Sequence, residues 1–196
     1  MDKGCLGMNH ILREIATSLE TERLILRMPQ VGDGTVVNQA IVASLDEMKP
    51  WLPFVQTTPA VEDTEANIRE SISNFMRRTG LRFLIFNKET KEYIGTTGFH
   101  NIDWDVQKLE IGYWIDTRHA GKGYMVEAID RLSRYALEEL EMKRVEIRTE
   151  AENVKSRAIP EKLGFRLEGI LENEDLSVDG LRWTDTCIYA KTTKKP

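Results

Sequence analysis

With 196 residues, of which 41% are hydrophobic and 30% charged, the chain is long enough for one domain with a single core. Its formal net charge of −5 argues against a dedicated nucleic-acid-binding protein and fits a cationic partner such as an amine. Cys5 and Cys187 form no CxxC pair and the three histidines lack metal-ligand spacing, so neither a disulfide framework nor a metal site is expected. No apolar run reaches the ~20 residues of a membrane span, and residues 1–7 lack a signal-peptide core, which favours a soluble, cytoplasmic protein that does not bind membranes.

Residue patterns in the first half of the chain predict a strand, two helices and two further strands. The expected elements, in chain order, are a strand at 24–26, helices at 34–45 and about 62–78, and strands at 82–86 and 93–100. A polar linker between the last two strands makes them a hairpin. Residues 1–17 precede these elements and are predicted to be an N-terminal extension to one domain at 18–192.

Residue patterns in the second half of the chain predict a strand, a loop with two glycines, a helix, a strand, a second helix and β structure at the end. Met125, Ile129 and Leu132 are spaced as on one face of an amphipathic helix. The other expected elements are strands at 109–115 and 144–150, a short helix at about 154–163 capped by Gly164, and β structure from 165 and at 183–191. This order predicts an α/β (α+β) fold, with a mixed, mostly antiparallel sheet flanked by helices.

The loop Arg118-His119-Ala120-Gly121-Lys122-Gly123 lies between a strand and a long helix. A helix N-terminus presents free N–H groups and a positive dipole end, which suits a phosphate or pyrophosphate. Glycines let the main chain approach such a ligand because they have no Cβ. A simpler interpretation is a plain strand–helix turn in which the glycines only relieve backbone strain.

Two better-known phosphate loops do not fit this segment. A P-loop needs GxxxxGK[ST], but Lys122-Gly123-Tyr124 lacks both the spacing and the hydroxyl. The dinucleotide fingerprint GxGxxG needs a glycine where the chain has Val126. Arg118, Gly121 and Gly123 instead match an RxxGxG pattern.

That pattern resembles the cofactor loop of the GCN5-related N-acetyltransferases (GNAT), and four other motifs resemble their RimJ/RimL branch. These motifs are Leu19–Arg27 followed by Trp51-Leu52-Pro53, Glu110–Ile115, Asn153–Ser156 and Lys162–Phe165. The resemblance covers about residues 19–191 and implies a single GNAT domain.

The resemblance implies that acetyl-CoA lies between the strands 109–115 and 144–150, which would splay apart. The main chain of Ile115 would contact the cofactor. The pyrophosphate would rest on N–H groups of the segment Arg118, His119, Ala120, Gly121, Lys122, Gly123 and Tyr124. Arg118 would shape the loop, the His119 side chain is expected to face solvent, and Asn153 would bind the pantetheine arm or simply cap a helix.

Direct attack of a neutral amine on the thioester needs a proton acceptor and a donor for the departing thiolate. Many family members use a tyrosine as that donor at the position where this chain has Pro160. Ser156 is therefore the candidate donor, although it could be only a polar residue in a first helical turn. The resemblance places the base about ten residues beyond Lys162–Phe165, where Asp175 aligns best, and Glu110 on the cofactor strand is the second candidate. A surface carboxylate that only interacts with water is the alternative for each.

The RimJ/RimL resemblance implies acetylation of a protein N-terminal α-amine, of the ribosomal-protein type, with Trp51 and Phe54 as walls of the acceptor site. Packing under a loop is the simpler role for these two side chains. A small-amine acetyltransferase acting on polyamines or aminoglycosides is a second hypothesis, and a strongly acidic pocket would favour polyamines. A non-catalytic CoA-binding module and a nucleotide-phosphate binder are further alternatives. Dimers are common in the family, which implies a homodimer.

Overall fold

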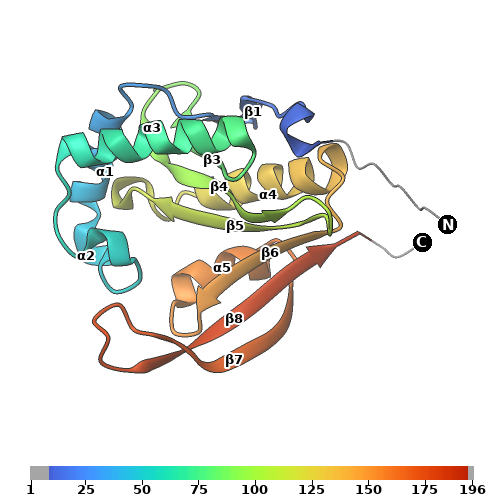
Figure 1. Cartoon of the computed structure of the whole chain (residues 1–196). Helices are drawn as coiled ribbons and strands as arrows, with labels where there is room; N and C mark the ends of the chain where they lie inside the picture. Colours follow the sequence, from blue (N-terminus) through green and yellow to red (C-terminus); the bar gives the residue numbers. More distant parts are fainter. Residues whose placement is uncertain (1–8, 194–196) are drawn as a thin grey trace.

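Eight strands form one sheet in the computed structural model, which describes residues 9–193 (Figure 1). The strands are β1 Ser18–Glu20, β2 Leu24–Arg27, β3 Leu81–Asn87, β4 Tyr93–Asp103, β5 Lys108–Ile115, β6 Arg144–Glu150, β7 Arg166–Leu176 and β8 Trp183–Thr192. The α-helices are α1 Gly34–Ala43, α2 Leu45–Met48, α3 Val61–Arg77, α4 Tyr124–Arg134 and α5 Val154–Lys162. The strand order is β1-β2-β3-β4-β5-β6-β8-β7, so the β7–β8 hairpin forms one edge of the sheet.

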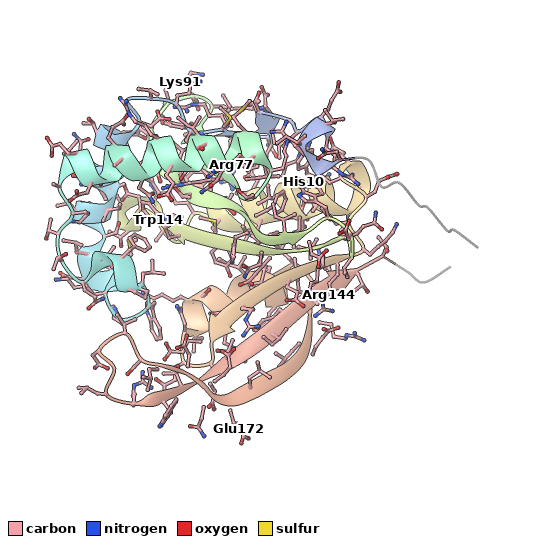
Figure 2. All side chains as sticks on the ribbon, in the orientation of Figure 1. His10, Arg77, Lys91, Trp114, Arg144 and Glu172 are labelled. Carbon is pink, nitrogen blue, oxygen red and sulfur yellow. The ribbon has the colours of Figure 1, made fainter. Side chains whose placement is uncertain are left out.

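Side chains that alternate along the strands divide the core between the two faces of the sheet. On one face, Trp114 of β5 packs with the buried Leu84 in the cluster that α1 and α3 cover (Figure 2). On the other face, Ile111 of the same strand packs with Met125 and Ile129 of α4. Strand β5 therefore has one layer of helices on each side.

The strands β5 and β6 are parallel, and the other neighbouring strands are antiparallel. Helix α4 connects β5 to β6, as expected for a parallel crossover. Their register pairs Lys108 with Arg144 and ends at Glu110 and Glu146, although β5 runs on to Ile115. The two strands separate beyond that point, which confirms the predicted splay.

The predicted elements are present with shifted ends, and three details were not predicted. Strand β1 is only three residues long, too short to show a period, and pairing with β2 holds it in the sheet. The helix expected at 34–45 ends at Ala43, because Ser44 leaves helical geometry before the short α2. Helix α4 continues into a π-helical turn at Tyr135–Glu139.

None of the helices within residues 9–193 is long and apolar enough to cross a membrane. In the same range, no group of three or more histidine, cysteine or acidic side chains is placed to hold a metal ion. Cys187 is a buried free thiol on β8, whereas Cys5 lies outside the described residues.

Candidate active site

The gap between β5 and β6 presents main-chain groups of β5. Asp116 donates its N–H to the Ile94 carbonyl on β4 (2.9 Å), and main-chain groups along a strand point alternately to its two neighbours. Ile115 and Tyr113 therefore direct their N–H and C=O groups toward β6. Because pairing with β6 has already ended, these groups can bond a ligand that lies between the strands.

The glycine loop leads into α4 with a row of free donors. Gly121 and Gly123 have φ angles of 77° and 79°, which glycine adopts without strain. The six consecutive backbone N–H groups from Gly121 to Val126 have no acceptor within residues 9–193. Together with the positive end of the helix dipole, they form a site for an anionic group such as a pyrophosphate.

Arg118 binds the loop itself. Its guanidinium forms an ion pair with the fully buried Asp116 (2.5 Å), and its backbone N–H donates to the same carboxylate (3.0 Å). Thr117, the residue before Arg118, donates its N–H to the Ser44 hydroxyl (2.9 Å). This hydrogen bond ties the loop to the break between α1 and α2. His119 is half-buried, and Ala120 and Lys122 are exposed.

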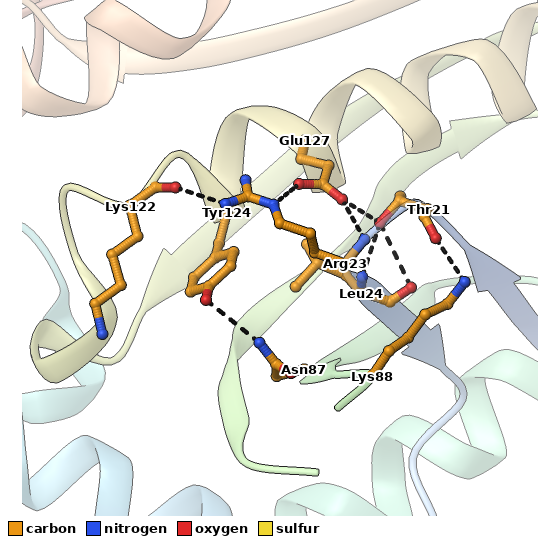
Figure 3. Close-up of polar contacts among 8 residues, drawn as sticks. All are labelled: Thr21, Arg23, Leu24, Asn87, Lys88, Lys122, Tyr124 and Glu127. Atoms are coloured by element: carbon orange, nitrogen blue, oxygen red, sulfur yellow. Dashed lines mark hydrogen bonds and ion pairs between the residues drawn. The ribbon is translucent and has the colours of Figure 1, made fainter. Parts of the chain in front are cut away.

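A network around Arg23 ties the start of α4 to the turn between β1 and β2 (Figure 3). Arg23 pairs with Glu127 of α4 (2.6 Å), donates to the Lys122 carbonyl (3.1 Å) and stacks on the Tyr124 ring at 4.6 Å. Burial raises the pKa of Glu127, but hydrogen bonds from Thr21 and Arg23 outweigh it and hold this pKa below its ordinary value. The network fixes the orientation of the free N–H groups.

On the other side of the gap, α5 begins with Asn153. Its side-chain oxygen accepts the Ser156 N–H (3.0 Å), so Asn153 is a helix cap. The Ser156 hydroxyl donates to the Tyr113 hydroxyl (3.2 Å), and Tyr113 donates to the Ser156 carbonyl (3.0 Å). Two hydroxyls, one from β5 and one from α5, therefore meet at the gap.

Tyr113 stays protonated at neutral pH. Burial raises the pKa of its phenol, outweighing the hydrogen bond from Ser156, and brings it to about 12. Tyr113 can therefore donate a hydrogen bond throughout the physiological range.

A cavity of about 340 Å³ lies beside the gap, between the sheet and α3. Its lining includes Arg82, His100 and Trp114 from the strands and Asn74 from α3, with the half-exposed Phe54 from the segment after α2. No aspartate or glutamate is among the described residues that line it. The described lining is thus mainly apolar and partly aromatic, with a few polar side chains and no carboxylate.

His100 and Glu110 form a pair across β4 and β5 at this cavity. The His100 Nε2 lies 3.1 Å from the Glu110 carboxylate, which also accepts from Asn101 (3.0 Å). Burial raises the pKa of Glu110, but these hydrogen bonds outweigh it and lower the pKa overall. The opposite edge of the imidazole faces Gly112, where a Cβ would lie 3.1 Å from Cε1 and 3.4 Å from Nδ1. The pair can bind a proton on Nδ1 while Glu110 orients the ring.

The predicted residues do not all converge on the cavity. Phe54 lines it, whereas Trp51 and Asp175 do not. Asp175 is exposed near the end of β7, where its carboxylate accepts the Leu176 N–H (2.8 Å). Three residues at the gap and cavity were not singled out from the sequence, namely Arg82, His100 and Tyr113. Nothing in their local sequence marks them, because only the strand register brings them together.

A sheet that opens between two parallel strands, beside a helix N-terminus with free N–H donors, suits an acyl-transferring enzyme with a phosphate-bearing cofactor, and the comparison with known proteins agrees that the chain is an acetyltransferase. Residues 23–166 match the family model described as the acetyltransferase (GNAT) domain. The chain belongs to the GNAT family and is an acetyltransferase.

Its relatives belong to the RimJ/RimL-like branch. A putative ribosomal N-acetyltransferase of Bacillus subtilis (strain 168) is 34% identical over 82% of this chain and 86% of its own length. The ribosomal-protein-serine acetyltransferase of Escherichia coli (strain K12) is 29% identical over 75% of this chain and 78% of its own. The fold is also that of RimL, the ribosomal L7/L12 alpha-N-protein acetyltransferase solved with coenzyme A. That comparison has a TM-score of 0.81 and 23% identity, and covers 88% of this chain and 95% of the other.

Proposed function

We propose that this enzyme transfers the acetyl group of acetyl-CoA to the α-amine of a protein N-terminus, of the ribosomal-protein type. The observation that carries the cofactor assignment is the gap between β5 and β6 beside six unpaired N–H groups. The unpaired main chain of Ile115 and Tyr113 fits an amide-containing pantetheine arm, and the residues from Gly121 onward fit its pyrophosphate. Asn153 would add a side-chain contact beyond its role as a helix cap.

The acceptor cavity supports an α-amine over a polyamine. A polyamine or aminoglycoside carries several positive charges, which carboxylates would have to balance. The described lining holds Arg82 and no carboxylate, and the nearby Glu110 carboxylate is already held by His100 and Asn101, so the cavity offers little negative charge to a multiply charged cation. The names of the relatives in Bacillus subtilis and Escherichia coli point the same way.

His100 is the base that this cavity favours. The acceptor amine must lose a proton as it attacks the acetyl carbonyl, and the imidazole Nδ1 beside Gly112 can take it. Glu110 then has a positioning role, because its carboxylate holds Nε2 and has a lowered pKa that makes it a weak base. Asp175 remains the competing candidate, and its substitution separates the two.

Ser156 is the proton donor for the departing thiolate, and Tyr113 supports it. The two hydroxyls lie 3.2 Å apart at the gap. When the amide bond forms and the carbon–sulfur bond breaks, a proton from the Ser156 hydroxyl neutralises the sulfur, the serine oxygen takes a proton back from water, and the amine proton goes to the base. A protonated Tyr113 holds Ser156 in place before the reaction.

The test is thiol release from acetyl-CoA with purified protein and a panel of acceptors, with products identified by mass spectrometry. The panel holds peptides with a free N-terminus, the same peptides with a blocked N-terminus and an internal lysine, spermidine, and an aminoglycoside. We expect acetylation of the free α-amine alone. Acetylation of spermidine or the aminoglycoside instead would establish the small-amine function. Acetyl-CoA binding with no turnover on any acceptor would support a CoA-binding module.

A homodimer remains part of the proposal. The β7–β8 hairpin at the sheet edge has exposed apolar side chains, Leu171, Leu181 and Trp183 among them, which a second copy would cover. Sedimentation at micromolar concentration is expected to give the mass of two chains, and a monomer at all concentrations would refute it.

A further inference from the structure

Arg82 is a half-buried arginine that lines the acceptor cavity. It sits on β3 beside Gly98 of β4, which in turn pairs with Gly112 of β5. Both glycines line the acceptor cavity beside the guanidinium, and a Cβ at Gly98 would collide with the main chain of Leu81 and Arg82. Helix α3 holds one end of the guanidinium, because Nη1 donates to Asn67 (2.6 Å) and Ser71 (3.2 Å).

The other nitrogens of Arg82 have no partner within residues 9–193. Nε is enclosed without an acceptor, and Nη2 makes no hydrogen bond. Arg82 is also in no ion pair of the described chain. Burial lowers the pKa of this guanidinium, and Tyr93 and Asp33 act in the opposite direction. Because a half-buried cation that only neutral groups hold gains from a charged hydrogen-bond partner, the free edge of the guanidinium suits an anion.

We infer that Arg82 binds a carboxylate of the acceptor, so that the preferred substrate is an α-amine with a carboxylate close to it. This inference rests on the proposed function, since it assigns a ligand to the proposed acceptor cavity. The carboxylate comes either from an acidic residue at the start of a protein chain or from the α-carboxylate of a free amino acid. In both cases the amine lies toward His100 and Gly112, on the β5 side of the cavity, and the carboxylate lies on the β3 side.

The experiment compares kcat/KM for pairs of acceptors that differ only in one charge. The first pair is a hexapeptide with N-terminal Glu and the same peptide with N-terminal Gln. The second pair is free alanine and alaninamide, which isolates the α-carboxylate. The proteins are the natural enzyme, Arg82→Gln, Arg82→Lys, and the control Arg69→Gln, which removes an exposed arginine of α3 that pairs with Glu65.

The natural enzyme is expected to prefer the acid member of one pair by about tenfold to a hundredfold, the range for a hydrogen bond to a charged group. Which pair shows the preference identifies the source of the carboxylate. Arg82→Gln is expected to bring the ratio close to one by lowering kcat/KM for the acid member more than for the uncharged member, with the KM for acetyl-CoA unchanged. Arg82→Lys should retain part of the preference, and Arg69→Gln all of it.

Equal activity of the natural enzyme on acid and amide would overturn the inference but leave the proposed function intact, and this arm needs no variant to fold. The same conclusion follows if Arg82→Gln lowers activity equally on both members of a pair. If the natural enzyme binds acetyl-CoA but acetylates neither member of either pair, the inference fails, and the wider acceptor panel decides separately whether the proposed function holds.

Discussion

The gap between β5 and β6 and the cavity under α3 share strand β5, yet they are built from different parts of the chain. The gap and the glycine loop present main-chain groups, which are unpaired N–H donors over residues 121–126 and the free edge of β5. The cavity presents side chains, with Arg82 from β3, His100 from β4 and Asn74 from α3. One region depends on backbone geometry and the other on the identity of individual residues.

This difference explains how one fold can keep the same cofactor while the acceptor that it binds changes. A main-chain site tolerates many side chains, provided that glycines allow the loop geometry. A side-chain site changes its ligand with each substitution. We therefore expect substitutions in the two regions to separate acetyl-CoA binding from turnover and acceptor choice.

The largest effect on turnover is expected for a substitution of His100, which tests the cavity that presents side chains. His100→Gln should lower kcat by about a hundredfold or more, because general base catalysis contributes that much, while the Kd for acetyl-CoA stays the same. The dependence of kcat on pH should also change, because the variant has no imidazole to take the amine proton. Steady-state kinetics between pH 5.5 and 9 and calorimetric titration measure both.

Two controls accompany His100→Gln. His10→Gln, which changes an exposed histidine in the N-terminal turn, should have no effect. Asp175→Asn should leave the pH profile unaltered. If Asp175→Asn flattens the profile and His100→Gln does not, Asp175 is the base and the role given to His100 is wrong.

A β-branched residue in the glycine loop is expected to weaken acetyl-CoA binding, which tests the region that presents main-chain groups. Gly123→Val needs a positive φ that costs valine at least 1–2 kcal/mol, and moving the loop would misplace several N–H donors. Acetyl-CoA should bind about a hundredfold more weakly, with an unchanged far-UV spectrum. Gly180→Val is the matched control, because Gly180 has a φ of 71° in the β7–β8 turn, away from the loop. Equal acetyl-CoA affinity in the two variants would mean that the pyrophosphate binds elsewhere.

The two hydroxyls at the gap are expected to have a moderate effect. Ser156→Ala should lower kcat about tenfold, and Tyr113→Phe severalfold, since Tyr113 acts through Ser156. Ser156→Thr should restore much of the rate because it keeps a hydroxyl. Tyr189→Phe is the control, because it removes another hydroxyl that contacts α5, the helix of Ser156, by donating to Glu161. If the double variant Ser156→Ala/Tyr113→Phe is no slower than Ser156→Ala, the two hydroxyls act in one step. If the two reductions in kcat multiply, the hydroxyls have separate roles.

The smallest effect concerns pH and stability outside both regions. Hydrogen bonds from Arg144 and then Arg166 lower the pKa of Glu168 from 4.5 to about 2. A lowered folded-state pKa stabilises the fold above pH 4.5, and that contribution is lost as the pH falls from 4.5 to 2. Glu168→Gln should lower Tm by roughly 1–3 °C at pH 7, and the difference from the natural protein should shrink toward pH 2. Glu172→Gln, on the same strand, is the control, and a constant difference for Glu168→Gln would contradict the assignment.

The same contrast explains how much could be predicted from sequence. The RxxGxG loop, the splayed strands and Ser156 lie in contiguous motifs, because a main-chain site needs glycines and a helix start in one stretch of chain. Arg118 was expected to shape the loop, and its ion pair with Asp116 agrees with that interpretation.

The acceptor side could not be predicted in the same way. Arg82 and His100 are separated by the β3–β4 hairpin, and only the antiparallel register places both at the cavity. Glu110 was considered as a base, but its hydrogen bonds with His100 and Asn101 depend on that register too. Tyr113 lies on the same face of β5 as the core residues Leu109 and Ile111, so its sequence position predicts a core residue. Only the tertiary structure shows that its hydroxyl contacts Ser156 of α5.

The most direct test of the two-region account is residue-resolved amide hydrogen exchange, with acetyl-CoA alone and then with an acceptor peptide added. Acetyl-CoA alone is predicted to protect the N–H groups of residues 121–126 and of Ile115, and to leave α3 and the His100 segment unchanged. Adding the acceptor should then protect the segments around Arg82 and His100. Protection of the cavity by acetyl-CoA alone, with no change at residues 121–126, would contradict the account.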